Sequence, residues 1–406
     1  MEPAEYISYG KQWIDENDIQ AVVSTLRSDR LTQGPKIDEF EKALAGFCGA
    51  RFAVAVNSGT SALHIACLAA GVQEGDEVIT SPNTFVASAN CAVYCGARPV
   101  FADIEPDTYN IIPQEMANKI TPLTKAVIPV HFSGQSCDMV SIKNIIQEEE
   151  KSADKKIYII EDACHALGSA YKGRKIGSCF YSDMTVMSFH PVKHITTGEG
   201  GAVLTNNESL YNRLKRFRSH GITSVPDEFI YKEEAFETSE GGFSQVRPWY
   251  YEQVALGYNY RITDLQCALG ISQLKKIVSF CKRRREIVNM YNEAFNDVNT
   301  LQTPFQSGDC DSYFHIYVLL FDWKAIGMNR TQFMLELRSR GIQTQVHYIP
   351  VPLHPYYREN FGTDLRDFPN TEKYYKGCLS IPLYPAMTDM DAKKVVAEIL
   401  RLAVRS

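Results

Sequence analysis

Short apolar runs alternate with helical patterns through the first half of the chain. Residues 52–56 form an unbroken apolar run, and residues 61–70 repeat apolar positions at helical spacing. Unbroken apolar strands that alternate with helices are typical of a parallel sheet buried on both faces. The pattern therefore predicts an α/β domain with a mostly parallel sheet. Its further strands are expected at 77–80, 98–103, 126–130, 157–161, 184–189 and 202–205, and its further helices at 85–94 and 140–150.

The pattern changes after residue 220. Residues 222–251 are polar and aromatic with no clear period, which indicates a long excursion from the fold. The remainder predicts helices at 263–295, 331–340 and 389–405 and strands at 313–321 and 344–348. The chain of 406 residues is too long for one small core. We expect a large α/β domain over 1–255, which includes the N-terminal segment, and a smaller α+β domain over 256–406.

Two helices are expected before the first strand, at 15–27 and 36–48, and either Asp15 or Asn17 would cap the first of them. The net charge is −6 and the pI is about 5.9, so no bulk attraction to a nucleic acid is expected. The densest basic cluster, residues 282–285, lies in a helical pattern and is interpreted as a solvated face or a helix end.

No membrane segment and no secretory signal are apparent, so the protein is expected in the cytoplasm. The eleven cysteines include no CxxC pair, which argues against a disulfide framework. Cys91 and Cys95 lie four residues apart on a predicted helix. They are interpreted as core thiols, and no metal site is expected.

A turn rich in small hydroxyl residues follows the first strand. Ser58, Gly59 and Thr60 open the helix after Val56, where backbone N–H groups and hydroxyls suit a phosphate. The same residues would also serve as an ordinary helix cap. The turn matches neither the P-loop nor the GxGxxG fingerprint, so a nicotinamide cofactor is not indicated.

Asp162 ends the apolar run 157–160, at the edge of the sheet where open α/β folds bind ligands. A carboxylate there suits a metal, a ribose or a protonated ring nitrogen, and it also suits a helix cap. His165 follows on the same side of a turn, where a structural role is equally compatible.

Lys193 lies between a strand and a glycine-rich turn. Ser188 precedes it on the strand, Pro191 interrupts that strand, and residues 198–201 let the chain turn back. A lysine in such a place needs partial desolvation to act as a free amine. Taken alone, Lys193 is interpreted as a surface residue.

In combination, the hydroxyl turn, Asp162 and the Ser188–Lys193 pair fit one ligand, pyridoxal 5′-phosphate. Its phosphate needs N–H and hydroxyl donors, its ring nitrogen an acidic partner and its aldehyde a lysine. Phe85 would cover one face of the ring, although a core phenylalanine is also compatible.

Four motifs resemble the DegT/StrS-type sugar-nucleotide aminotransferases: NSGTSAL, EDACHALGS, SFHPVKHITTGEGGAV and GYNYRITDLQCALG. The resemblance covers the chain from about residue 10 nearly to its C-terminus. It implies the fold of the fold type I (aspartate-aminotransferase-like) enzymes that depend on pyridoxal 5′-phosphate. It also implies roles for single residues: Lys193 as the Schiff-base lysine, Asp162 as partner of the ring nitrogen, Thr60, Ser61 and Ser188 as phosphate ligands, Phe85 stacked on the ring and His165 near the ring hydroxyl. Asn259 would reach the phosphate in a neighbouring subunit, which implies a homodimer with shared active sites.

Further motifs resemble the pseudaminic-acid branch of this family (PseC type), among them VHYIPVPLHPYYR at 346–358. That resemblance implies transfer of an amino group from L-glutamate to C4 of UDP-2-acetamido-2,6-dideoxy-L-arabino-hexos-4-ulose. The branch usually has proline where this chain has His194. A different UDP-, dTDP- or GDP-linked 3- or 4-keto sugar, or a regulator that binds the cofactor without turnover, remains an alternative. Lysine at 193 argues against a sugar dehydratase, in which histidine replaces it. The candidate cations for the substrate diphosphate are Lys11, Arg218, Arg247 and Arg261.

Overall fold

A seven-stranded sheet forms the centre of the protein, and the computed structural model describes residues 6–238 and 244–404. β9 runs antiparallel to both of its neighbours, whereas all other neighbouring strands are parallel. The predicted α/β fold with a mostly parallel sheet is therefore confirmed. Across the sheet the strands are β1 (Phe52–Val56), β9 (Gly201–Thr205), β8 (Met184–Ser188), β5 (Tyr158–Asp162), β4 (Thr124–Ile128), β2 (Glu77–Thr80) and β3 (Arg98–Phe101).

Helices cover both faces of this sheet, and alternate residues of β1 show why. Val54 and Val56 join a core with α3 (Gly59–Ala70), α4 (Ala87–Tyr94) and α7 (Glu208–Arg218). Ala53 and Ala55 join another core with α2 (Pro35–Cys48). Successive side chains of a strand point to opposite faces, so a strand covered on both faces is apolar throughout. Further helices of this half are α1 (Glu16–Leu26), α5 (Pro113–Asn118) and α6 (Met139–Ala153).

Local sequence signals located most of these elements to within a few residues. Asp15 caps α1 through a hydrogen bond from the backbone N–H of Asp18, as one of the two alternatives predicted. The pattern did not predict α5 or α7. Only Leu210 and Leu214 are buried in α7, and the polar residues around them hide the helical period.

A further core lies in the C-terminal half. It joins β16 (Tyr317–Phe321), β17 (Cys378–Ile381), α10 (Ile277–Phe295), α12 (Arg330–Ser339) and α15 (Asp389–Ala403). The predicted helix 263–295 is two helices, because α9 (Asp264–Leu274) ends before Lys275. The predicted strand 344–348 is wrong, since Gln345 makes only a single bridge with Ser380. The predicted end of the last helix at residue 405 lies outside the described residues.

The remaining elements of this half are α11 (Trp323–Ile326), α13 (Pro355–Phe361), α14 (Pro369–Gly377), β14 (Leu301–Gln302) and β15 (Cys310–Asp311). Ile7 belongs to the C-terminal core and bridges Ile342, whereas α9 packs on α1 and α2. The N-terminal segment and α9 therefore tie the two halves together. The domain division at 255/256 remains a prediction.

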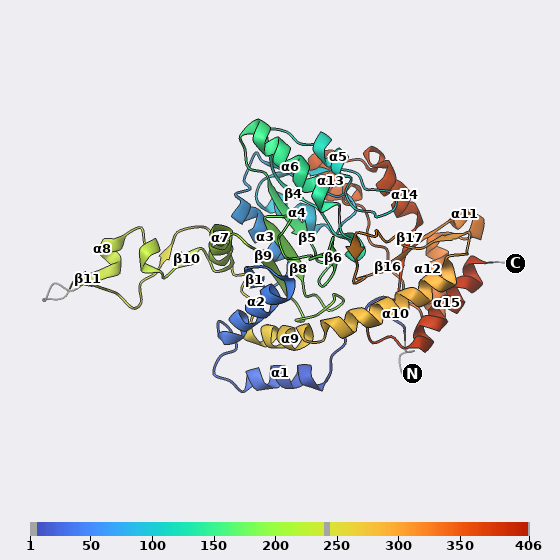
Figure 1. Cartoon of the computed structure of the whole chain (residues 1–406), viewed down its shortest axis with the longest axis horizontal. Helices are drawn as coiled ribbons and strands as arrows, with labels where there is room; N and C mark the ends of the chain where they lie inside the picture. Colours follow the sequence, from blue (N-terminus) through green and yellow to red (C-terminus); the bar gives the residue numbers. More distant parts are fainter. Residues whose placement is uncertain (1–5, 239–243, 405–406) are drawn as a thin grey trace.

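Residues 222–238 and 244–253 form an arm that projects from the body (Figure 1). Its described part contains β10 (Ile222–Thr223) paired with β13 (Glu252–Gln253), α8 (Lys232–Ala235), and the hairpin of β11 (Phe236–Thr238) and β12 (Ser244–Val246). A Cβ on Gly221 would lie 1.8 Å from the carbonyl oxygen of Ala255, so the chain crossing at the root requires glycine. Among the described helices, none is long and apolar enough to cross a membrane.

Candidate active site

One cavity of about 370 Å³ lies where β5 and β8 end and α3 begins. It brings together six of the eight site residues predicted from the sequence: Thr60, Phe85, Asp162, His165, Ser188 and Lys193. Residues that the sequence analysis did not single out for the site also line it, among them Tyr9, Ser88 and His315. The cavity joins both halves of the chain.

The N-terminus of α3 forms one wall of the cavity. Ser58 caps this helix, and its Oγ accepts a hydrogen bond of 3.1 Å from the backbone N–H of Ser61. A Cβ on Gly59 would lie 3.0 Å from the Cβ of Ser188, so glycine lets the helix approach the end of β8. The free N–H groups of this first turn and the Thr60 and Ser188 side chains therefore face one space, as an anion-binding site requires.

Two predicted site residues are placed differently. Ser61 is buried and does not line the cavity, and its hydroxyl donates a hydrogen bond of 2.7 Å to Asn57 Oδ1. Its backbone N–H already donates a hydrogen bond to Oγ of Ser58, the residue that caps α3. The Asn259 side chain is exposed and does not line the cavity of its own chain. The backbone of Asn259 bridges Ser219 beside the root of the arm.

Asp162 is buried at the end of β5 and is held by two donors. The Ser88 hydroxyl donates to Oδ2 over 2.6 Å, and the backbone N–H of Cys164 donates to Oδ1 over 3.2 Å. Ser88 in turn shares a hydrogen bond of 2.7 Å with Thr84. These contacts fix the orientation of the carboxylate, which faces the cavity as a preformed acceptor.

Lys193 meets a histidine from the other half of the chain. Its Nζ lies 3.3 Å from Nε2 of His315. Burial lowers the pKa of the Lys193 amine, whereas the nearby Cys164 and Asp162 raise it. Burial first, and then the Lys193 charge, hold the pKa of His315 well below its usual range. A neutral imidazole therefore contacts the lysine.

Arg284 holds the backbone that carries His315. This arginine is buried, and its Nη1 donates to the carbonyl oxygens of Phe314, His315 and Leu383. The interpretation of residues 282–285 as a solvated face is therefore wrong for Arg284. Its partners lie 30 or more residues away along the chain, which a helical pattern cannot reveal.

His165 and Tyr348 form a hydrogen-bonded pair in the same cavity. The backbone N–H of Ser133 donates to Nδ1 of His165, so Nε2 carries the proton and donates to the Tyr348 hydroxyl over 2.9 Å. Burial, followed by the Lys193 charge, keeps the pKa of His165 well below its usual range. The pair presents a neutral, polar edge beside Lys193.

Phe85 lies at the rim of the cavity. Its side chain is 56% exposed, so it is not a core residue, and its ring centroid lies 6.1 Å from that of Tyr348. Tyr9 lies near the same rim, with its ring 5.5 Å from that of His347. An aromatic face is thus free to cover a flat ligand.

The candidate diphosphate cations do not line this cavity. Arg218 is occupied by Glu41 and by the carbonyl oxygen of Ala55, and Arg247 lies on the arm. Lys11 and Arg261 are likewise absent from the lining, and Lys193 is the one lysine or arginine among the described residues that form it. Positive charge for a further phosphate must come from elsewhere.

These residues fit pyridoxal 5′-phosphate by their chemistry. The α3 turn with Thr60 and Ser188 offers donors for a phosphate, Asp162 an acceptor for a protonated ring nitrogen, and Lys193 an amine for the aldehyde. Within the described residues, no cluster of histidine, cysteine, aspartate or glutamate is arranged to hold a metal ion.

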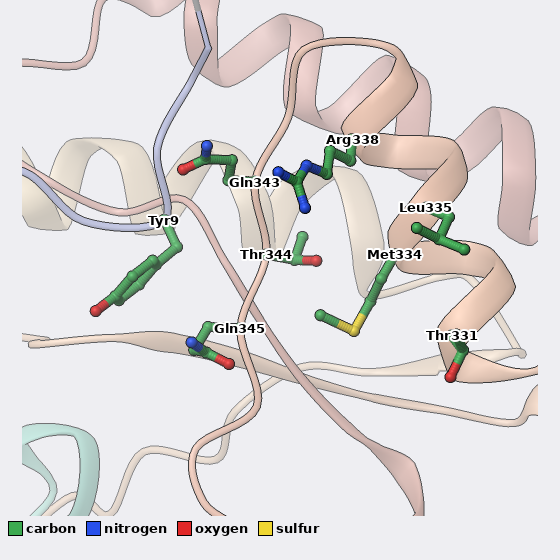
Figure 2. A pocket seen from close by; sticks show the side chains of 8 residues that line it. All are labelled: Tyr9, Thr331, Met334, Leu335, Arg338, Gln343, Thr344 and Gln345. Carbon is green, nitrogen blue, oxygen red and sulfur yellow. The ribbon is translucent and has the colours of Figure 1, made fainter.

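A second cavity of about 400 Å³ adjoins the first, and Tyr9 lines both. Figure 2 shows it between α12, which carries Arg338, and residues 343–345. The sequence analysis did not predict it, because its two walls are defined only when α12 packs beside the chain that leaves it.

The sequence matches the DegT/DnrJ/EryC1/StrS aminotransferase family over residues 12–400. The chain is 42% identical to the spore coat polysaccharide biosynthesis protein SpsC of Bacillus subtilis, over 97% of this chain and 96% of that protein. It is 38% identical to the UDP-4-amino-4,6-dideoxy-N-acetyl-β-L-altrosamine transaminase of Campylobacter jejuni, over 96% of this chain and 95% of that protein.

The structure is similar to the pyridoxal 5′-phosphate form of the sugar aminotransferase Spr1654 from Streptococcus pneumoniae. The TM-score is 0.86 with 29% sequence identity, and the match covers 98% of each chain. The fold and the cofactor predicted from the sequence are both confirmed by this likeness and by the family match.

Proposed function

The chain belongs to the DegT/DnrJ/EryC1/StrS aminotransferase family of pyridoxal 5′-phosphate-dependent sugar aminotransferases, and within it we propose a specific substrate. The protein transfers the amino group of L-glutamate to C4 of UDP-2-acetamido-2,6-dideoxy-L-arabino-hexos-4-ulose. The observation that carries this proposal is the 38% identity to the Campylobacter jejuni transaminase named for the corresponding 4-amino sugar. The motif at 346–358 adds support from the sequence.

Lys193 is the central residue of the proposed mechanism. Bound pyridoxal 5′-phosphate supplies an aldehyde carbon for the lysine and a ring that accepts an electron pair. Lys193 would hold the cofactor and, once released by the amino donor, would take a proton from the donor's α-carbon and deliver it to the carbon that had carried the aldehyde. Because burial lowers its pKa, the amine is more readily available as a base than a solvated lysine.

Other residues hold the reacting groups. Asp162, fixed by Ser88 and the Cys164 N–H, accepts a hydrogen bond from the ring nitrogen and favours its protonated form. Thr60, Ser188 and the first turn of α3 bind the cofactor phosphate. His165 and Tyr348 would lie on the side of the ring hydroxyl, and Phe85 would cover a face of the ring.

We also propose that the active unit is a homodimer. The exposed Asn259 lies at the root of the arm, close to β1 and the phosphate turn of its own chain. The described part of the arm exposes large apolar side chains, with Ile230 at 64%, Trp249 at 70% and Tyr251 at 61%. Burial of such residues against a second copy would cover them and carry Asn259 to the partner's site. A comparison of the sedimentation of the Trp249→Ser variant with that of the wild type tests whether the arm contributes to a homodimer.

A panel of UDP-, dTDP- and GDP-linked 4-keto and 3-keto sugars, offered with glutamate and the holoenzyme, tests the substrate. Mass spectrometry and NMR of the product determine the nucleotide, the aminated carbon and its configuration. Formation of the C4-amino UDP sugar supports the proposal, whereas turnover of another panel member alone contradicts it.

The likeness to SpsC favours a second candidate. This relative is slightly more similar, at 42% identity, and it is named for spore coat polysaccharide biosynthesis. A different nucleotide-linked keto sugar destined for a polysaccharide is therefore the alternative substrate, and the same panel distinguishes it. Cytoplasmic location, expected from the sequence, is part of the proposal because nucleotide sugars are made there.

A further inference from the structure

We propose that Cys95 is a site of reversible oxidation by a hydroperoxide, with His64 as the group that activates its sulfur and Cys67 as the thiol that closes a disulfide with it. His64 and Cys67 belong to α3, and Cys95 ends α4. All three lie outside the residues that line the cavity around Lys193. The site is therefore independent of the proposed transfer of the amino group.

The packing of α3 against α4 brings these side chains together. His64 and Cys67 lie three residues apart and therefore on one face of α3. The side chains of Cys67 and Cys95 pack in the same core. The His64 ring lies 5.3 Å from the ring of Tyr94, the residue before Cys95. One imidazole and two thiols from two helices thus form a single cluster.

Cys95 is the thiol of this cluster that solvent reaches. Cys67 and Cys91 are both 0% exposed, whereas Cys95 is partly exposed. The interpretation of Cys91 and Cys95 as core thiols therefore holds only for Cys91. Cys91 also donates its S–H to the carbonyl oxygen of Ser88 over 3.3 Å, so it is already engaged. A small oxidant meets Cys95 first, and Cys67 is the unengaged thiol next to it.

His64 offers this cluster an unused ring nitrogen. Its side chain is 3% exposed, and its Nδ1 lies 3.1 Å from the hydroxyl of Tyr260. Its Nε2 is buried and has no hydrogen-bond partner among the described residues. When the Tyr260 hydroxyl donates to Nδ1, Nε2 carries the ring proton, and the Cys95 sulfur is the acceptor beside it. A thiolate on Cys95 satisfies a donor that is otherwise buried without a partner.

The electrostatics of the cluster favour that thiolate. The neighbouring Cys67 thiol is the main cause that lowers the pKa of Cys95 to about 6, and His64 adds to it against the opposing effect of burial. Contacts with Cys91 and Cys95, together with burial, raise the pKa of Cys67 well above its usual value, so Cys67 stays protonated and donates to the thiolate. By contrast, burial raises the pKa of the partly exposed Cys310 to about 11. Cys95 therefore combines access with a nucleophilic sulfur.

The reaction balances with a hydroperoxide as the oxidant. The Cys95 thiolate attacks one peroxide oxygen, so that an S–O bond forms and the O–O bond breaks, and the leaving oxygen takes a proton through His64. Cys67 then attacks the oxidised sulfur: an S–S bond forms, the S–O bond breaks, and the hydroxyl leaves as water with the Cys67 proton. The two sulfurs lose two electrons in all, and the peroxide gains them. The disulfide joins the helix that carries Thr60 to the helix that carries Ser88.

Mass spectrometry of the holoenzyme after brief treatment with hydrogen peroxide tests the disulfide. Cleavage after Glu74 separates Cys67 from Cys95. Cleavage after Tyr94 separates Cys91 from Cys95, so the linked peptides identify the pair. We expect a link between Cys67 and Cys95 that dithiothreitol reverses. In Cys67→Ser, oxidation should stop at a sulfenic acid on Cys95, which dimedone traps. A wild-type protein without this link, or with a link through Cys91, overturns the proposal.

Alkylation by iodoacetamide tests the thiolate in the reduced wild-type holoenzyme and needs no substitution. At about pH 7, Cys95 should react at least roughly 10-fold faster than Cys310, because the thiolate is the nucleophile. Equal rates at the two cysteines overturn the proposal. Cys310→Ser is the matched control, and it should leave both the alkylation rate of Cys95 and the disulfide unchanged.

Substitution of His64 tests its part in the activation. His64→Leu should slow the alkylation of Cys95 roughly 10-fold, the scale of one hydrogen bond to a charged group, and should leave Cys310 unaffected. His64→Gln retains a donor and should restore part of the rate. The absorbance of the bound cofactor and its conversion by glutamate verify that each variant is folded. A Cys95 rate in folded His64→Leu within about twofold of the wild type removes His64 from the proposal.

Discussion

The Nζ atom of Lys193 lies 3.3 Å from Nε2 of His315, although 122 residues separate them in the chain. His315 is buried, and Arg284 on α10 donates a hydrogen bond to its carbonyl oxygen. In the described structure, Nδ1 of His315 has no hydrogen-bond partner. The C-terminal half of the chain therefore supplies a neutral, firmly positioned group at the lysine proposed to react.

Removal of Lys193 should abolish the reaction. Lys193→Ala deletes the amine that holds the cofactor and moves the proton, so turnover should fall by more than about 10³-fold. Borohydride should trap the cofactor on the wild type and not on the variant. Lys172→Ala, a surface lysine paired with Asp309, is the control. Near wild-type turnover in Lys193→Ala would exclude the assignment.

Removal of His315 should change the acidity of the lysine. Because neutral Nε2 accepts a hydrogen bond from the charged amine, His315→Leu leaves a partly buried ammonium without this acceptor. The pKa of Lys193, already lowered by burial, should fall further. The pH dependence of Lys193 modification by an amine reagent in the apoprotein measures this change.

His315→Gln retains a polar group and should restore part of the difference. A merely structural role for His315 predicts a lower melting temperature in both variants and no movement of the Lys193 titration. That outcome would contradict the proposed contact.

Asp162 and Ser88 should act together on the cofactor. Asp162→Asn removes the negative charge beside the ring nitrogen and should slow the glutamate half-reaction roughly 100-fold or more, as expected for loss of one partner of a buried charge pair. Ser88→Ala removes only the 2.6 Å hydrogen bond that orients the carboxylate and should cost about 3- to 10-fold. Stopped-flow absorbance measures both rates, and equal effects of the two substitutions would contradict this order.

Buried histidines should make the apoprotein sensitive to mild acid. Burial is the largest cause that holds the pKa of His165, His194 and His315 well below the usual value, and the Lys193 charge adds to it in each case. Unfolded histidines bind protons below about pH 6.5, whereas these folded ones do not. Stability should therefore fall as the pH drops below that value, by about 1.4 kcal/mol per pH unit for each histidine.

Urea unfolding of the apoprotein between about pH 5.5 and 7.5 measures this slope. His194→Asn should reduce it by about one proton. A flat profile for the wild type would show that the three histidines titrate normally in the folded state.

Much of the fold could be predicted because its signals are local. The apolar runs of β1 and β2 were placed at their observed bounds, since a buried parallel strand is recognisable within five residues. The predicted strand 344–348 failed for a different reason. Four of its five residues line cavities, and the segment makes one bridge, to Ser380, rather than a ladder.

The residues of the candidate site also fall into two groups, those that a local sequence signal predicts and those that no local signal predicts. Thr60, Asp162 and Lys193 follow strands or open a helix, so their chain positions already predicted that they would meet at one edge of the sheet. Ser88 and His315 carry no such signal. Each is recognised only by the atom it contacts, Asp162 Oδ2 or Lys193 Nζ, and neither contact is local in the chain.

By itself, the sequence determined the α/β architecture and the cofactor, and it predicted which lysine reacts. Hydrophobic period, helix caps and the order of motifs are properties of short segments, and they depend little on what packs around them. Only the tertiary structure decided that His315 faces Lys193, that Arg284 is buried beneath it and that Arg338 borders a second cavity next to Tyr9. Those relationships arise from packing between segments far apart in the chain, where burial and charge are set by neighbours that no local pattern contains.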